Sequence, residues 1–263
     1  MTELRGMELE AEFAVVGKEL GLAYKEGFWV IKRLSFSIKK GSVFAILGPN
    51  GCGKTTLLKI ILDLLQPQVG SIHKRGEMAL VPQLFQVSFA FSALEMVVMG
   101  RAKKIGLFSQ PGLKDRRLAL EALERLNIAD LAARPFPELS GGQRQLVMLA
   151  RALVAEADIL VLDEPASSLD FKNQALVLQW MKRLSRENGL TVVCTTHQPQ
   201  HALAAADEAL LMTGEEGGLV GRADEILSEA NLKRLYGVDI KRLSFEHLGR
   251  VEEALTPVYL KLS

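Results

Sequence analysis

The chain has 263 residues, of which 48% are apolar and 24% charged, and its formal net charge is +1. These values are typical of a globular protein with one large domain or two small ones and enough residues to bury a core. The near-neutral charge provides no overall field to attract nucleic acid or an anionic membrane, and no uncharged apolar stretch reaches the roughly 18 residues that a membrane-spanning helix needs.

The strands expected from the sequence are of two kinds. Residues 28–38 predict an antiparallel strand. Short, continuous apolar runs at Val43–Leu47 and Ile159–Leu162, and a shorter one at Val192–Cys194, predict strands that are buried on both faces, which is typical of a parallel sheet. Helix-like patterns follow these runs, so the sequence predicts an α/β fold with its site at the carboxyl ends of the strands.

A helical insertion is expected between these strands. At residues 118–126, apolar side chains recur at helical spacing among Arg and Glu, which predicts an amphipathic helix. We interpret the segment 89–138 as a mostly helical insertion, although a surface helix pair without a role would show the same pattern. The tail from residue 214 contains one more amphipathic stretch, 224–236, and is too short for a regulatory domain of ordinary size.

A glycine-rich segment directly follows the run Val43–Leu47 and precedes a helical pattern at residues 56–65. Its residues read G-x-x-x-x-G-K-[ST]: Gly48, Pro49, Asn50, Gly51, Cys52, Gly53, Lys54 and Thr55. Glycines allow backbone N–H groups to turn onto phosphate oxygens, and the helix that begins here adds the positive end of its dipole. The pattern predicts that Lys54 reaches the β- and γ-phosphates of a nucleotide and that Thr55 is a ligand of Mg²⁺.

Candidate catalytic groups follow other apolar runs. Asp163 and Glu164 end the run Ile159–Leu162. Beside a phosphate loop, Asp163 would hold Mg²⁺ and Glu164 would polarise the attacking water as a general base; on their own, an acidic strand cap explains them equally well. His197 follows another strand and is a candidate for contacting the γ-phosphate, although a lone histidine is more often structural. Gln83, after a short apolar strand, is a candidate ligand of water or the metal.

A second glycine-rich motif opens a helix at residues 144–155. It reads Leu139-Ser140-Gly141-Gly142-Gln143. A serine and glycines at a helix N-terminus form another anion site. A simple kinase needs only one such site, whereas two are explained if the second serves the ATP held by a neighbouring copy.

The combination of motifs resembles the ATPase subunits of ATP-binding cassette (ABC) transporters. The resemblance extends from about Tyr24 to Met212, with the motifs in the order phosphate loop, Gln83, L-S-G-G-Q, acid pair, Ser167-Ser168-Leu169-Asp170, His197. The last two are similar to the D-loop and the switch histidine of that family. Tyr24 resembles the aromatic residue that stacks on adenine, but one extra residue separates it from the next strand, so Phe28 and Trp29 are alternatives.

The resemblance implies a P-loop NTPase core with a mostly parallel sheet, a small antiparallel β subdomain and an inserted helical subdomain. It also implies a head-to-tail pair of chains that encloses two ATP molecules with Mg²⁺. The implied nucleotide contacts are Tyr24, Gly48, Pro49, Asn50, Gly51, Cys52, Gly53, Lys54, Thr55, Thr56, Ser140, Gly141, Gly142, Gln143 and Asp170. The implied metal ligands are Thr55, Gln83 and Asp163, and the implied catalytic residues are Lys54, Gln83, Glu164 and His197.

Two departures from the family pattern carry expectations. Cys52 replaces a smaller residue, and its side chain is expected to point away from the phosphates. The segment 70–80 is short, so the antiparallel β subdomain is expected to be trimmed. The chain is expected to be a single ATPase domain over residues 1–263, with the helical subdomain at about 89–155 and a C-terminal extension at 214–263.

Within this family, residues 81–85, 89–92, 97–101 and 195–199 are similar to the importers of ferric siderophores, vitamin B12 and molybdate, with a slight preference for the molybdate/tungstate members. This group implies membrane-spanning permease subunits, docked near Leu84, Phe85, Phe89 and Phe91, and a periplasmic or surface substrate-binding protein. A core of the helical insertion itself explains these four apolar residues equally well. It also implies a place on the cytoplasmic face of the plasma membrane. Two distant cysteines and the lack of an apolar leader in residues 1–11 agree with a cytosolic chain.

Two other functions are weighed against this reading. A non-transport ABC ATPase acting in DNA repair or translation would carry a long coiled-coil insertion or a second cassette, and the sequence has neither. A P-loop kinase of small molecules would leave the motif at Leu139–Gln143 unexplained. We therefore expect ATP hydrolysis coupled to import of a metal chelate or an oxyanion, without nucleic acid.

Overall fold

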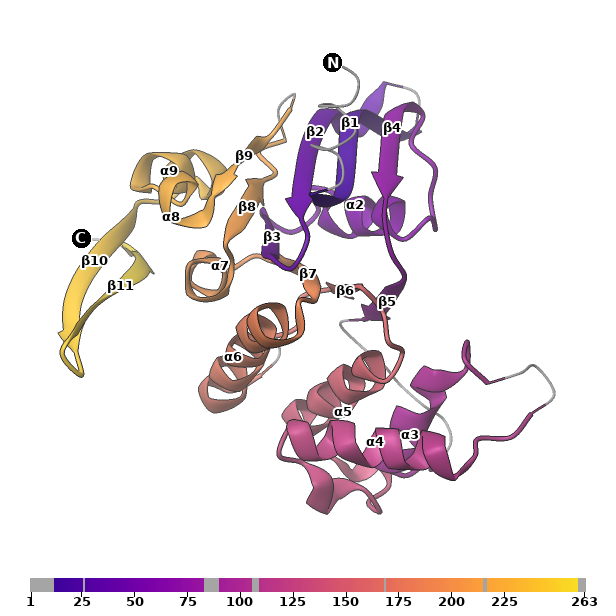
Figure 1. Cartoon of the computed structure of the whole chain (residues 1–263). Helices are drawn as coiled ribbons and strands as arrows, with labels where there is room; N and C mark the ends of the chain where they lie inside the picture. Colours follow the sequence, from indigo (N-terminus) through magenta and orange to yellow (C-terminus); the bar gives the residue numbers. More distant parts are fainter. Residues whose placement is uncertain are drawn as a thin grey trace. The chain divides into compact units, whose positions relative to one another are not determined.

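The computed structural model describes residues 12–25, 27–82, 90–105, 109–167, 169–214 and 217–259. They form two compact units (Figure 1). The first unit runs to Arg75 and resumes at Val193, and the second is Gly76–Val192. The chain passes from the second unit back into the first within strand β7 (Thr191–Thr196).

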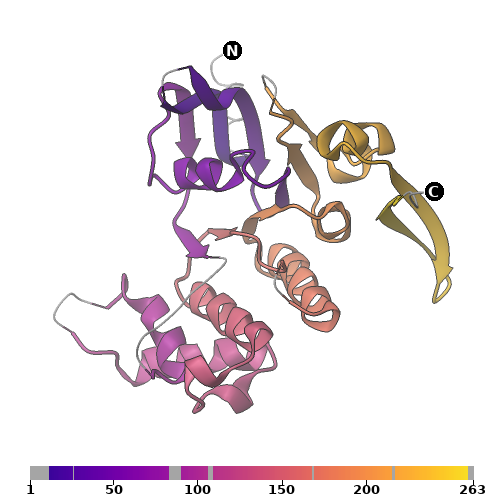
Figure 2. The same ribbon diagram turned by 180° about the vertical axis from the view of Figure 1, so that it is seen from behind.

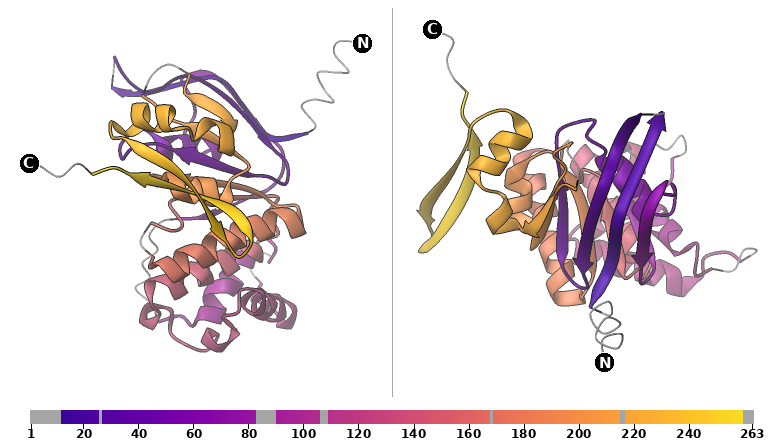
Figure 3. Two further views of the ribbon diagram at one scale, coloured as in Figure 1. Left: turned by 90° about the vertical axis from the view of Figure 1, so that its left-hand side faces the viewer. Right: turned by 90° about the horizontal axis from the view of Figure 1, so that it is seen from above.

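The first unit begins with a small antiparallel sheet. Its strands β1 (Phe13–Lys25), β2 (Phe28–Lys39) and β4 (Val69–Lys74) are ordered β2-β1-β4, as the right panel of Figure 3 shows for the indigo and violet strands. The sequence predicted β2 but not β1. The reason is that bulges and a left-handed Glu19 (φ +50°) interrupt the alternation of apolar side chains along β1.

The first unit also contains the strand that leads to the phosphate loop. β3 (Val43–Leu47) is buried along its whole length and pairs in parallel with β8 (Glu208–Leu211), whose other neighbour is the antiparallel strand β9 (Leu219–Arg222). β7 is the neighbour of β3 on its other side. Helix α2 (Lys54–Ile61) starts earlier and ends earlier than the predicted 56–65, because Asp63 takes a left-handed conformation (φ +60°) that an α-helix cannot continue.

The C-terminal part of the first unit is more ordered than the sequence indicated. The predicted stretch 224–236 is two helices, α8 (Ala223–Ile226) and α9 (Glu229–Tyr236), because Ser228 caps a new helix start. A β-hairpin follows, β10 (Ile240–His247) and β11 (Arg250–Pro257), drawn in yellow in Figure 3. Its two turn residues, Leu248 and Gly249, both have positive φ, as a two-residue hairpin turn of this kind requires.

The second unit combines a parallel strand pair with helices. Strands β5 (Met78–Val81) and β6 (Ile159–Leu162) pair in parallel, and helices α3, α4 and α5 gather in one group (Figure 2). The helical segments are α3 (Ala93–Val98), η1 (Met99–Arg101), α4 (Leu113–Arg125), η2 (Ala129–Leu131), η3 (Phe136–Glu138), α5 (Gly141–Leu153), α6 (Phe171–Asn188) and, in the first unit, α7 (Pro199–Ala205). The predicted helical insertion is therefore confirmed.

Buried side chains explain why the insertion is helical. Met96 of α3, Leu123 of α4, its C-cap residue Leu126 and Phe136 of η3 are almost completely buried. Arg101, also buried, donates to Asp115 (2.9 Å) and Glu156 (2.5 Å), so an ion-pair network joins η1 to the start of α4 and to the segment after α5. No helix in the described part of the chain has both the length and the apolarity to cross a membrane.

Candidate functional site

The phosphate loop, residues 48–53, joins β3 to α2 in the first unit. Lys54, the first residue of α2, turns back over the loop, and its Nζ donates to the carbonyl oxygens of Gly48 (2.9 Å) and Pro49 (3.1 Å). Lys54 is only 6% exposed. A positive charge is thus held inside the curve of the loop, where a polyphosphate would need it.

Gly53 is the loop position that most clearly requires a glycine. Its φ of +103° lies in the left-handed region, and a Cβ there would lie 2.8 Å from Val30 Cγ1 and 3.1 Å from Val30 O. The absence of a side chain lets β2 approach the start of α2 closely. This contact fixes the end of the loop against the antiparallel sheet.

The start of α2 fits a polyphosphate with a bound cation. Gly53 provides no side-chain cap, and the first turn of α2 contains no acidic residue. The N-terminal N–H groups of a helix lack partners within it and carry the positive end of the dipole. Thr55 is exposed in this turn, and its hydroxyl is the kind of hard oxygen ligand that Mg²⁺ takes.

The candidate aromatic residues for adenine stacking lie on β1 and β2. Tyr24 is 59% exposed, and its hydroxyl lies 3.2 Å from Thr56 Oγ1 on α2. Phe28 is 74% exposed, whereas Trp29 is 44% exposed and lies over the backbone of Gly21. Tyr24 is therefore in contact with the helix that follows the phosphate loop, and the choice among Tyr24, Phe28 and Trp29 as the adenine-stacking residue stays a prediction.

Cys52 is the phosphate-loop residue that directly precedes Gly53. Its side chain lines a small cavity of about 50 Å³ together with Trp29 and Met212. Burial raises the pKa of the thiol, although the Lys54 ammonium acts in the opposite direction. The expected direction of the Cys52 side chain, away from the phosphates, stays a prediction.

His197 follows β7, the strand next to β3, so the histidine and the phosphate loop belong to the same unit. The turn after it is tight, since the Gln198 N–H donates to Thr196 Oγ1 (3.0 Å). His201 on α7 is buried, and burial together with the neighbouring His197 lowers the pKa of His201. His201 was not predicted from the sequence, and its burial indicates that it is a core residue.

The acid pair lies in the second unit, at the end of β6. The Asp163 N–H donates to Val81 O (3.1 Å), so the pairing with β5 extends to the first acid. Glu164 has a left-handed backbone (φ +46°), and its carbonyl oxygen accepts from the Ser167 N–H (3.2 Å) and hydroxyl (3.1 Å). This conformation costs about 1–2 kcal/mol in a residue with a Cβ, and strain of this kind clusters at functional sites.

The signature turn, residues Ser140–Gln143, is the start of α5. Ser140 is the N-cap, and the turn is a capping box: Ser140 Oγ accepts from the Gln143 N–H (3.3 Å) and Gln143 Oε1 accepts from the Ser140 N–H (3.0 Å). Ser140 and Gly141 are exposed, whereas Gly142 is buried. The exposed helix start is accessible to an anion supplied by another molecule.

Asp170 begins α6 in the same unit. As N-cap, it accepts from the Asn173 backbone N–H (2.8 Å). Gln83, Leu84, Phe85, Phe89 and Ser168 were candidate residues and lie outside the described residues. Sequence reasoning overlooked Ser167 as a support of Glu164 and Asn173 as a partner of Asp170; the Asp-x-x-Asn spacing at a helix start is a signal that could have found the second.

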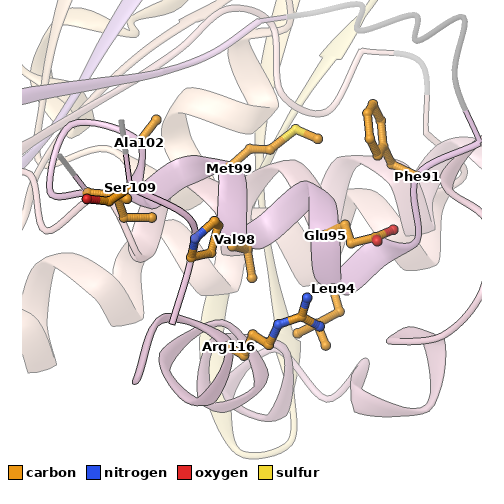
Figure 4. A pocket seen from close by; sticks show the side chains of 10 residues that line it. Phe91, Leu94, Glu95, Val98, Met99, Ala102, Ser109 and Arg116 are labelled. Atoms are coloured by element: carbon orange, nitrogen blue, oxygen red, sulfur yellow. The ribbon is translucent and has the colours of Figure 1, made fainter. Parts of the chain in front are cut away.

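An apolar groove of about 500 Å³ lies in the helical insertion. Figure 4 shows its lining residues, which come from α3, η1, the start of α4, the segment between η1 and α4, and Phe91 just before α3. The lining residues are Phe91, Leu94, Glu95, Val98, Met99, Ala102, Ile105, Ser109, Pro111 and Arg116. Phe91 is the one predicted docking residue that the structure describes, and it lies in this groove.

Comparisons with known proteins bear on both units. A family described as ABC transporter matches residues 31–167. The chain is 38% identical over 245 residues to the molybdate import ATP-binding protein MolC of Haemophilus influenzae, which covers 93% of this chain and 95% of that protein. It is 32% identical over 237 residues to the iron(3+)-hydroxamate import ATP-binding protein FhuC of Bacillus subtilis, covering 84% and 87%.

Solved structures give the same result. A chain of a metal-chelate type ABC transporter in an inward-facing conformation has a TM-score of 0.89 and 38% identity, covering 94% of this chain and 98% of that one. A dimeric ATP-binding cassette in a post-hydrolysis state, bound to ADP and Pi, has a TM-score of 0.70 and 29% identity, covering 80% and 98%.

A P-loop core, an inserted helical subdomain and an L-S-G-G-Q helix start together define an ATP-binding cassette. The chain belongs to the ABC transporter family and is an ATP-binding domain of that family. The predicted resemblance and fold class are confirmed. The division into a single domain with its two sub-segments, and the role of each site residue, stay predictions.

Proposed function

We propose that the chain hydrolyses ATP as one of two paired copies and so powers import through membrane-spanning permease subunits. The observation that carries this proposal is the presence of two anion-binding helix starts in one chain: a phosphate loop with Lys54 inside it and a signature turn exposed at the start of α5. One nucleotide needs one phosphate-binding helix start. A second, exposed one has a use if it closes over the ATP of a partner copy.

In this proposal each residue has a defined task. Lys54 and the α2 N-terminus bind the β- and γ-phosphates, and Tyr24 supports the adenine. Glu164 orients the attacking water as a general base, and His197 holds the γ-phosphate. Mg²⁺, for which Thr55, Asp163 and Gln83 are the proposed ligands, would neutralise charge on the phosphate oxygens.

The cargo is proposed to be a metal chelate or an oxyanion. This rests on the names of the relatives, which are molybdate and iron(3+)-hydroxamate importers, and on the likeness to a metal-chelate transporter. We also propose the partners and place that such a function needs: permease subunits, a periplasmic or surface substrate-binding protein, and the cytoplasmic face of the plasma membrane. No observation favours a role in DNA repair or translation.

We propose that the groove lined by Phe91, Leu94 and Met99 receives a short cytoplasmic helix of the permease. The groove is apolar along α3 and carries an acid, Glu95, and a base, Arg116, at its border. An apolar centre with a charged rim is the usual composition of a protein–protein interface. Movement of the helical insertion would then be transmitted directly to the permease.

The central test is Glu164→Gln with ATP. We expect hydrolysis to fall by about 10²–10⁴-fold, because the general base is lost, while ATP stabilises a dimer by mass action. Sedimentation measures the dimer and phosphate release measures the rate. A variant that stays monomeric with ATP, both alone and with the permease, would contradict the pairing.

The groove is tested separately with Met99→Glu. We expect this variant to lose co-purification with a co-expressed permease and to keep ATP-dependent dimerisation in the Glu164→Gln background. The control is Leu120→Glu, since Leu120 is 38% exposed on α4 and does not line the groove. Permease binding that survives Met99→Glu unchanged would exclude the groove as the docking site.

A further inference from the structure

The signature turn and the start of α6 meet at a single side chain. A Cβ at Gly142 would lie 2.5 Å from Asn173 Nδ2 and 2.6 Å from Asn173 Cγ. A Cβ atom essentially never lies within 3.0 Å of a non-bonded heavy atom, so the carboxamide of Asn173 fills the space that the Cβ of any larger residue at position 142 would need. This contact lies entirely within the second unit.

The two glycines of the turn differ in this respect. A Cβ at Gly141 would meet nothing within 4 Å, and neither glycine has a positive φ. Backbone conformation therefore demands no glycine at either position. At Gly142 the demand comes from Asn173.

Asn173 is itself fixed by Asp170. Its backbone N–H donates to Asp170 Oδ1 (2.8 Å) and its Nδ2 donates to Asp170 Oδ2 (3.0 Å), so both carboxylate oxygens bind the same residue. The orientation of the carboxamide follows from chemistry, because an ionised carboxylate can only accept. Hydrogen bonds to a charged acceptor are stronger than neutral ones, and the Asn173 side chain is thus held firmly against Gly142.

We propose that Asn173 is a positioning residue that locks the signature turn to Asp170 and to the segment leading back to Glu164. This inference rests on the proposed function, in which the turn closes over the partner's ATP. A displacement of the Gly142 backbone by a phosphate presses on the carboxamide of Asn173. Asn173 passes the displacement to Asp170, the N-cap at the end of the segment that begins at Glu164. Engagement of ATP by the turn is thereby coupled to the position of the general base.

The first experiment is a double-mutant cycle of Gly142→Ala and Asn173→Ala. Each single variant lowers kcat, by about 10- to 100-fold for a misplaced catalytic group, while the KM of Asn173→Ala changes little because the phosphate loop is intact. The double variant has the kcat of Asn173→Ala alone, since the added methyl group then meets no side chain. If the fold-losses in kcat of the two single variants multiply in the double variant, the proposal is wrong.

The matched control is Gly141→Ala with and without Asn173→Ala. Because a Cβ at position 141 contacts no other atom, the fold-losses in kcat of Gly141→Ala and Asn173→Ala multiply in that double variant. Should Gly142→Ala fail to fold, thermal unfolding carries the same test: the double variant unfolds at a higher temperature than Gly142→Ala, whereas the proposal is wrong if removing the Asn173 side chain gives no recovery.

A charge swap tests the bond to Asp170. Asn173→Asp places two carboxylates together and lowers kcat, and Asp170→Asn in the same chain restores a single carboxylate and recovers at least about tenfold. The failure of the swap to recover activity would count against the lock. Two experiments distinguish failure of the proposed function from failure of this inference. If Glu164→Gln does not dimerise with ATP, the proposed function is wrong. If it dimerises but the kcat losses of Gly142→Ala and Asn173→Ala multiply, only the role of Asn173 is wrong.

Discussion

The phosphate loop and the signature turn are both glycine-rich helix starts, yet the chain builds them in different ways. The loop surrounds a buried ammonium, that of Lys54 on α2, which donates to the loop carbonyl oxygens of Gly48 and Pro49, and the loop ends at a left-handed glycine, Gly53. The signature turn is an ordinary helix start that is closed by its own side chains, Ser140 and Gln143. Arg144, the cationic residue that follows the turn, donates to the carbonyl oxygen of Pro137 (3.3 Å), which precedes the turn in the chain.

The difference indicates a division of labour. A loop with a resident cation can bind a triphosphate alone, because charge-assisted bonds are among the strongest polar interactions. A turn that offers a hydroxyl and the dipole of α5 binds an anion weakly, so it acts best on a phosphate that is already held. An exposed turn of this kind is suited to a ligand that arrives on another molecule.

The largest expected effect is on ATP trapping by a dimer in which one copy has an inactivated phosphate loop and the other an inactivated signature turn. Lys54→Ala disables the loop, and Gly141→Glu sets a carboxylate on the turn at a position with room for it. In the Glu164→Gln background we expect neither variant alone to trap ATP. A dimer with one copy of each has one intact site and traps one nucleotide, as measured by nucleotide bound per isolated, differently tagged dimer.

The control for this experiment carries both changes in one chain. Paired with a Glu164→Gln copy, it gives a dimer in which each site has lost one half, and we expect no trapped ATP. If this dimer traps as much nucleotide as the mixed one, the two regions do not cooperate across copies.

The next effect concerns stability. Gly53→Ala forces a Cβ into a left-handed conformation close to Val30, and we expect a loss of about 1–3 kcal/mol in the free energy of unfolding. Gly141→Ala should change it by less than about 1 kcal/mol, because an alanine is well tolerated in an open helical position. Denaturant titration measures the free energy of unfolding of both variants. Equal losses would mean that position 53 has no special requirement for glycine.

A smaller effect is expected at the caps of the signature turn. Ser140→Ala removes the N-cap and should cost about 1 kcal/mol of stability, and Gln143→Ala removes the reciprocal bond and should cost somewhat less. Both are measured by thermal unfolding of the chain without ATP. The comparison between the regions is weakened if neither variant shifts the unfolding temperature.

The smallest effect depends on pH and belongs to the first unit. Burial lowers the pKa of His201, so below the unfolded value of about 6.5 the unfolded chain binds a proton that the folded chain does not. Stability therefore falls as the pH drops through that value, and above it His201 contributes nothing to the pH dependence. His201→Gln should flatten the fall in stability as the pH drops below about 6.5, and an unchanged profile would show that other groups cause it.

Much of the site could be predicted because its signals are local. The glycine–lysine spacing after β3, the acids after β6 and the helix start at Ser140 each lie within a few residues and follow an apolar strand or precede a helix. Strand β1 was missed because bulges break its pattern, and the hairpin β10–β11 was missed because most of its apolar residues are exposed rather than alternating into a core.

The sequence by itself determined the class of protein, since each motif depends on backbone geometry that a few neighbouring residues specify. Only the tertiary structure decided which side chains support those motifs. Asn173 lies against Gly142 although their sequence positions differ by 31. The Tyr24 hydroxyl lies within hydrogen-bond distance of Thr56, although strands β2 and β3 come between them in the sequence. Such contacts depend on how helices and strands pack, and packing is set by the whole set of buried side chains, which no local pattern specifies.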